Sequence, residues 1–263
     1  MSRLRKIFLS AEKVFIKLKW GYFANPKASK IRHSAELLVI KKEIYADIAK
    51  ICIQSYLYWN REAVVSVHCD DQTFSNLNKW KSKNRFKSRI DVLNTYRSDP
   101  RNWQDIKLEV LLSLNGSHIF FMDADLRWNG PFLIQTSTPT FLVREFRLKN
   151  RAPYKQIIEN NLLSKYLEAS MWNTSFFTFS GFKISENQMR EIQEVHQKLL
   201  QIIQGNDIGS DDKSSLIRLA EQLAISIAAQ SWGVDLGSLK DVDGFKDGSF
   251  LESSYFGATG ATF

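Results

Sequence analysis

The chain has 263 residues, of which 44% are hydrophobic and 24% are charged, so a wholly disordered polymer is excluded and a large core can form. Its two cysteines, Cys52 and Cys69, belong to no CxxC motif or Cys/His cluster, so neither a zinc site nor a disulfide framework is supported. The net charge of +8 lies in residues 1–33, which carry nine basic residues and one acid, and the 27 basic and 27 acidic residues that remain cancel. This distribution predicts a neutral body with a basic arm, and no binding of nucleic acid.

In the arm, apolar residues recur at helical spacing, with lysines and arginines between them: Leu4, Ile7, Phe8, Ala11, Val14, Phe15 and Leu18. Such a helix could lie on an anionic membrane surface or pack against its own domain, and the pattern does not separate these alternatives. No run of 18 apolar residues exists, and charges interrupt the first 20 residues, so neither a transmembrane helix nor a signal peptide is expected. We therefore expect a cytoplasmic protein, with the arm as a candidate peripheral anchor at the inner membrane face.

After a turn-rich linker at 24–30, predicted strands and helices alternate. The strands are expected at 35–40, 63–68, 89–93 and 118–122, and the helices between them at 45–59, 72–80 and 103–114. This alternation predicts right-handed βαβ units and an α/β fold with a mostly parallel sheet flanked by helices.

The second half is less regular. Strands are expected at 140–145, 175–180 and 234–236, helices at 154–166, 186–203 and 216–230, and a polar loop at 205–215. The predicted organisation is a basic arm at 1–33, a single α/β domain at 34–240 and a Gly/Ser-rich tail at 241–263.

The most informative segment is HIFFMDADLRWNGPF at 118–132, in which an apolar strand ends directly in Asp123 and Asp125. Ligands of open α/β sheets bind at the carboxyl ends of the strands. The two carboxylates can approach one point if the strand breaks into a turn there, and a cation between them would relieve their repulsion. Oxygen ligands of this kind suit Mn²⁺ or Mg²⁺, either of which would neutralise a diphosphate.

The segment FFMDADLRW resembles the Asp-X-Asp motif of GT-A-fold glycosyltransferases, and most of all retaining family 8 and its relatives. The order along the chain is also similar, since about three βα units precede the motif. Two weaker correspondences are WNTSFF at 172–177 and EQLAIS at 221–226, so the resemblance spans residues 35 to about 236. It implies a GT-A-like, Rossmann-type twisted mixed sheet and the transfer of a sugar from a nucleotide donor, expected to be a UDP-sugar, to an acceptor hydroxyl.

Carried over residue by residue, the resemblance makes Asp123 and Asp125 the metal and diphosphate ligands, with Ala124 between them at the donor. Asn173 would contact a sugar, and Glu221 with Gln222 would line the acceptor side at the reaction centre. Further donor contacts are implied for two lysines, Lys41 after the first strand and Lys107 on the helix before the motif. Both lysines could instead be solvated side chains.

This sequence departs from the family pattern at two places. The family has a C-terminal histidine that completes the metal site, whereas no histidine follows His196 here, so water, Asp241 or Asp243 would have to replace it. The family's Asn-Ala-Gly is Asn173-Thr174-Ser175. Glu221 would be the base of an inverting reaction or a positioning group in a retaining one, and the sequence leaves this open, like the identity of the glycan, lipid or protein acceptor.

Simpler roles exist for several of these residues. The Asp-X-Asp pair could cap a helix or bind backbone amides. Trp172 could stack on a sugar, but core packing is the ordinary role of a tryptophan. In the segment His68-Cys69-Asp70-Asp71, a nucleophilic cysteine is disfavoured, and the aspartates are explained as well by capping the following helix as by a nucleotide contact.

Two other functions remain open. A phosphatase of the haloacid dehalogenase type also ends an apolar strand in Asp-X-Asp, although that motif stands near the N-terminus in such enzymes. Alternatively, a GT-A-like domain could bind a nucleotide or glycan without turnover.

Overall fold

The structure, a computed structural model, describes residues 34–39, 43–96, 103–113, 119–124, 126–128, 138–141, 144–147, 170–178, 184–233, 236–238 and 251–253. The basic arm, the linker and the predicted helix at 154–166 lie outside these residues.

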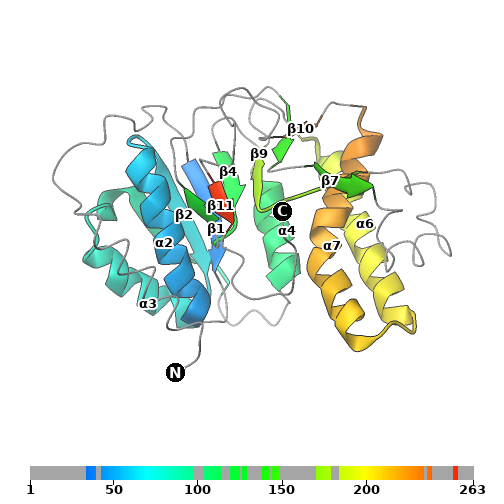
Figure 1. The fold of residues 1–263 in the computed structure, drawn as a ribbon, viewed down its shortest axis with the longest axis horizontal. Coiled ribbons are helices and arrows are strands. Elements are labelled where there is room, and N and C mark those ends of the chain that lie inside the picture. Colours follow the sequence, from blue (N-terminus) through cyan, green and yellow to red (C-terminus); the bar gives the residue numbers. More distant parts are fainter. Residues whose placement is uncertain are drawn as a thin grey trace.

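The first half contains the expected βα units (Figure 1). The strands are β1 (Ser34–Val39), β2 (Val64–Cys69), β3 (Ile90–Asn94) and β4 (Ile119–Met122). The helices are α2 (Glu43–Trp59), α3 (Asp71–Ser82) and α4 (Trp103–Ser113), and a 3₁₀ turn, η1 (Lys87–Arg89), precedes β3. The alternation of apolar runs therefore predicted the four strands and three α-helices of this half to within a few residues, but not η1.

The main sheet has seven strands in the order β10-β6-β9-β4-β1-β2-β3. The four strands of the first half run parallel to one another, β9 (Phe176–Thr178) is antiparallel to both β4 and β6 (Thr140–Phe141), and β10 (Gly237–Ser238) is parallel to β6. One strand thus opposes the other six. The predicted fold class, a mostly parallel mixed sheet flanked by helices, is confirmed.

Two helices of the second half pack against each other at one end of the molecule, opposite α2 and α3, with α4 between the two groups (Figure 1). They are α6 (Glu186–Gly205) and α7 (Ser210–Ser231). A capping box starts α6, because the Ser185 hydroxyl accepts from the Gln188 N–H and the Gln188 side chain binds the Ser185 N–H.

The second half departs from the prediction in several places. The strand expected at 140–145 is divided between two strands, β6 and β7 (Arg144–Arg147). They belong to different sheets, because β7 pairs with β8 (Ser170–Trp172), a strand that was not predicted. The loop expected at 205–215 ends at residue 209, where α7 begins. Polar Ser and Asp residues are favourable in the first turn of a helix, so they did not mark a loop here.

Two further short strands form a separate ribbon. β5 (Leu126–Trp128), directly after the Asp-X-Asp motif, pairs antiparallel with β11 (Leu251–Ser253). Three residues of the predicted tail therefore lie beside the segment that follows the motif. The strand expected at 234–236 appears slightly later, as β10.

The core has one cluster on each face of the sheet. Adjacent residues of β4 enter different clusters, since Phe120 packs with α2 and Phe121 packs with α4, α6 and α7. Phe176 and Phe177 of β9 divide in the same way. The period-two alternation of strand side chains thus places α2 on one face and α4 with α7 on the other.

Candidate active site

The helix α4 carries Lys107 into the protein interior. The side chain of Lys107 is only 6% exposed, and its ammonium lies 5.4 Å from the centre of the Phe121 ring. The alternative of a solvated helix lysine is therefore wrong. A buried ammonium needs negative partners, and the structure supplies two of them.

Asp123 follows β4 at the point where the strand breaks into a turn. Its N–H donates to the Ser175 carbonyl at 2.7 Å, and its carbonyl accepts from the Leu126 N–H at 3.3 Å, as in a β-turn. The Cys52 thiol also contacts this carbonyl, at 3.6 Å. A strand that turns at the motif is what the sequence required, although Asp125 lies outside the described residues.

Asp123, Lys107 and Glu221 form one cluster. The Lys107 Nζ lies 3.0 Å from Asp123 Oδ1, 3.3 Å from Asp123 Oδ2 and 3.2 Å from Glu221 Oε1. The Asp123 side chain is 26% exposed and the Glu221 side chain 3%, so the cluster runs from the interior toward solvent. Asp123 thus takes an ammonium as its partner, rather than backbone amides or a helix end.

Burial and charge oppose each other in this cluster. Burial works to lower the pKa of Lys107, but the charges of Asp123 and Glu221 outweigh it and hold that pKa above its ordinary value. Burial raises the pKa of Glu221, and the neighbouring Asp123 adds to the rise while Lys107 opposes it. Glu221 Oε2 is buried and has no hydrogen-bond partner among the described residues. The unsatisfied oxygen of Glu221 lies beside the Lys107–Asp123 ion pair, which extends to the protein surface. This arrangement suits a site that binds a ligand.

The helix α7 is held in register with β8 by buried hydrogen bonds. The Trp172 N–H donates to the Ser226 hydroxyl at 2.9 Å, and this hydroxyl donates to the Gln222 carbonyl at 2.7 Å. The Gln230 side chain donates to the Ser170 carbonyl at 3.1 Å. These bonds fix where Glu221 and the buried Gln222 stand relative to β8.

Asn173 lies just after β8 and shapes its own loop. Its side-chain oxygen accepts from the Ser175 N–H at 2.8 Å, and the Ser175 carbonyl in turn holds the Asp123 N–H. Asn173 is buried and so supports the turn at Asp123. Trp172 is buried against Phe141, with ring centres 5.4 Å apart, so the core role expected for it is correct.

The other predicted residues are distributed as follows. Ala124 is buried beside Asp123. Lys41, Asp241 and Asp243 fall outside the described residues, as Asp125 does. Within the described ranges, no three His, Cys, Asp or Glu side chains converge in a way that could hold a metal ion.

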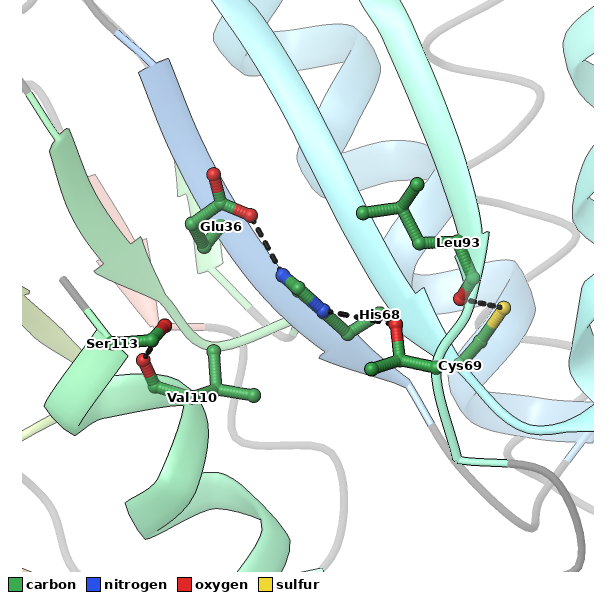
Figure 2. Close-up of polar contacts among 7 residues, drawn as sticks. Glu36, His68, Cys69, Leu93, Val110 and Ser113 are labelled. Carbon is green, nitrogen blue, oxygen red and sulfur yellow. Dashed lines mark hydrogen bonds and ion pairs between the residues drawn. The ribbon is translucent and has the colours of Figure 1, made fainter.

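The segment at the end of β2 has a structural role. The His68 ring points toward Glu36 (Figure 2). Its Nε2 lies 2.8 Å from Glu36 Oε2, and its Nδ1 lies 3.2 Å from Thr95 Oγ1. The Cys69 thiol contacts the Leu93 carbonyl at 3.3 Å, and burial, followed by the charges of the adjacent aspartates, raises its pKa to about 12. A thiol of this kind is a poor nucleophile. Asp70 caps α3 by accepting from the Thr73 N–H at 2.9 Å, as its position before a helix suggested.

Sequence reasoning selected Lys107, Asp123 and Glu221 separately and assigned them to different tasks. It missed their common ion-pair cluster, and it also missed Ser175 and Ser226, which position Asp123 and α7. The sequence did hold a signal that Lys107 is buried. It stands four residues from both Trp103 and Leu111, within the apolar stripe of α4.

A scan against models of known families finds no match, and a search of curated proteins finds none. Among solved structures, the chain is similar to the PaToxG glycosyltransferase, at 12% identity and a TM-score of 0.42, over 88% of this chain and 80% of that one. It is similar to apo mouse xyloside xylosyltransferase 1, at 11% identity and a TM-score of 0.41, over 80% and 85%. It is also similar to the mannosyltransferase PcManGT from Pyrobaculum calidifontis in complex with GDP-Man and Mn²⁺, at 13% identity and a TM-score of 0.34, over 89% and 86%.

These three structures are glycosyltransferases, the class that the segment FFMDADLRW resembles. The narrower assignment to family 8 stays a prediction.

Proposed function

We propose that this protein is a glycosyltransferase that moves a sugar from a nucleotide-sugar donor, a UDP-sugar, to an acceptor hydroxyl. The observation that carries the proposal is the cluster of Lys107, Asp123 and Glu221 at the carboxyl end of β4. That end of a parallel strand is where α/β sheets bind ligands, and the cluster combines acidic and basic groups suited to a diphosphate and a hydroxyl.

A divalent cation, Mn²⁺ or Mg²⁺, fits the chemistry of the donor set. Asp123 offers a partly exposed carboxylate, Asp125 follows it two residues later, and the buried Glu221 Oε2 lacks a hydrogen-bond partner in the described structure. Asp123 and Asp125 would hold the cation. When bound, the cation supplies neutralisation of the negative charge that develops on the leaving nucleoside diphosphate.

The side chains of the cluster have separate tasks. Lys107 offers a positive charge to phosphate oxygens, because neighbouring carboxylates keep it protonated. Glu221 accepts the proton of the acceptor hydroxyl in an inverting reaction, and its raised pKa moves it toward the range of an effective base. In a retaining reaction, Glu221 and Gln222 position the sugar. Asn173 and Lys41 are the proposed additional donor contacts.

The experiment is the release of UDP from UDP-sugars by the full chain with Mn²⁺, measured by chromatography. We expect release that a chelator abolishes and that Asp123→Asn and Asp125→Ala each reduce at least about 100-fold. The matched control is Asp207→Asn, at an exposed position between α6 and α7, which should release UDP at the unaltered rate.

The same assay distinguishes the other functions. Binding of UDP without any turnover would indicate a non-catalytic nucleotide-binding domain. Phosphate release from simple phosphate esters would indicate a phosphatase and refute sugar transfer.

We also propose that the protein is cytoplasmic and that its basic arm attaches it to the inner membrane face. Among the described residues, no helix is long and apolar enough to span a bilayer. The support is the charge distribution, since residues 1–33 carry the entire net charge. Binding to vesicles with anionic lipids should be lost on deletion of residues 1–22, and equal binding after this deletion would refute the attachment.

A further inference from the structure

The Lys107 ammonium forms an ion pair with Asp123, the carboxylate that the proposed function assigns to a metal ion. Both oxygens of Asp123 lie within hydrogen-bonding or ion-pairing distance of Nζ, at 3.0 and 3.3 Å. The lysine cannot simply swing into solvent, since its side chain is 6% exposed and belongs to a buried helix face. Lys107, which Asp123 shares with Glu221, is therefore already the counter-ion of Asp123 before any ligand arrives.

Lys107 has a second set of contacts that does not involve Asp123. Glu221 Oε1 lies 3.2 Å from Nζ, and the face of the Phe121 ring lies 5.4 Å away. A carboxylate and an aromatic face both stabilise an ammonium in an interior position. The ammonium can therefore give up Asp123 and remain held by Glu221 and Phe121.

A divalent cation and this ammonium compete for Asp123. A divalent cation held by Asp123 would come close to the Lys107 ammonium, which contacts both oxygens of the same carboxylate, and the two positive charges would repel each other. A diphosphate would change this balance, because its negative oxygens would give the Lys107 ammonium another partner.

From this geometry we infer that Lys107 is a counter-ion that holds Asp123 in the absence of donor, so that divalent-cation binding becomes conditional on a nucleoside diphosphate. The inference rests on the proposed function and adds an order of binding, in which the diphosphate binds before the divalent cation. Lys107 would leave Asp123 for the diphosphate, and the carboxylate of Asp123 would then be free to hold the cation. By linkage, the cation must strengthen diphosphate binding by the same factor.

The test is calorimetric titration of the full chain with Mn²⁺, with and without saturating UDP. For the unaltered protein we expect Mn²⁺ to bind at least about tenfold more tightly with UDP than without it. Coupling alone would also follow from any metal that contacts a phosphate, so the decisive variant is Lys107→Met. This variant should bind Mn²⁺ alone at least about tenfold more tightly than the unaltered protein, and should lose most of the effect of UDP.

Two controls sharpen the comparison. Lys107→Arg keeps the charge and should keep the weak binding of Mn²⁺ alone, whereas Lys198→Met, at an exposed position of α6, should change neither measurement. Circular dichroism checks that each variant is folded.

The outcomes separate the inference from the proposed function. Equal Mn²⁺ affinity with and without UDP in the unaltered protein overturns the inference, whether or not Lys107→Met folds, and leaves sugar transfer standing if UDP binds. Unchanged Mn²⁺ affinity in a folded Lys107→Met also overturns it. If UDP does not bind at all, the proposed function fails, while tighter Mn²⁺ binding by Lys107→Met alone would still support the competition at Asp123.

Discussion

Arg89, at the end of η1, shows how a single side chain can close the end of a helix. Its guanidinium donates to four carbonyls in and after the last turn of α2, those of Leu57, Asn60, Arg61 and Ala63, at 3.0, 2.7, 2.6 and 3.3 Å. The last carbonyls of a helix have no partner within the helix. The planar fork of donors in arginine can serve several of them at once, from two nitrogens held in a fixed geometry.

Replacing Arg89 by methionine should therefore destabilise the protein. We expect Arg89→Met to lower the free energy of unfolding by about 2–3 kcal/mol, since the half-buried carbonyls lose charge-assisted hydrogen bonds. Urea unfolding measures the change. Lys87→Met, two residues earlier in η1 and exposed, is the control and should fall within about 0.5 kcal/mol of the unaltered protein. Equal losses in the two variants would show that the carbonyl contacts contribute nothing.

At the scale of elements, the sequence predicted what depends on local periodicity. β1 alternates strictly between buried and half-buried side chains, and this pattern is written in its apolar residues. The short strands were not predictable in this way. β8 and β5 have three residues each, too few for a period, and they exist because distant partners, β7 and β11, supply their hydrogen bonds.

The prediction of where α7 begins was wrong for a related reason. Its first residues, SDDKSS, have the composition of a loop, yet they continue a helix whose later residues are buried. Ser and Asp are favourable in the first turn of a helix, and packing of the apolar second half stabilises the whole helix, so the loop-like composition did not prevent a helix here.

The tie between α7 and β8 gives a prediction at this scale. Ser226→Ala removes the acceptor of the buried Trp172 N–H, and an unsatisfied buried amide costs about 1–3 kcal/mol of the free energy of unfolding. The matched control is Ser231→Ala on the same helix, whose exposed hydroxyl donates to Glu191 and should matter by less than about 0.5 kcal/mol. Thermal or urea unfolding distinguishes the two, and a Ser226→Ala variant as stable as Ser231→Ala would refute the role of this hydrogen bond.

At the scale of the whole molecule, the candidate site depends on segments that are far apart in the sequence. Lys107 comes from α4, Asp123 from the end of β4 and Glu221 from α7, and each position was a candidate on its own. Their convergence follows from the packing of α4 and α7 on the same face of the sheet. No single-sequence pattern records which helix covers which face, so the ion-pair cluster could not be predicted, whereas the position of the motif at a strand end could.

His196 links α6 to α4 and makes global stability depend on pH. Its ring is buried, Nδ1 lies 3.6 Å from Asp105 Oδ1, and Nε2 has no hydrogen-bond partner among the described residues. Burial lowers the pKa of His196 below its ordinary value of 6.5, although the nearby Asp105 works to raise it. The folded protein therefore keeps this ring neutral at a pH at which the unfolded chain already binds a proton.

The direction of the pH effect follows from this difference. Above pH 7 the ring is neutral in both states and makes no pH-dependent contribution. As the pH falls through about 6.5 the unfolded chain gains a proton that the folded protein does not, so the free energy of unfolding should fall by up to about 1.4 kcal/mol per pH unit until the folded ring also titrates.

The measurement is urea unfolding between pH 5 and pH 8 for the unaltered protein and for His196→Gln. The difference between the two curves should be constant above pH 7 and should shrink toward pH 5, because only the unaltered protein carries this destabilisation in acid. The other groups of the chain are common to both proteins and cancel, so a difference that does not change with pH would show that His196 titrates alike in the folded and unfolded states.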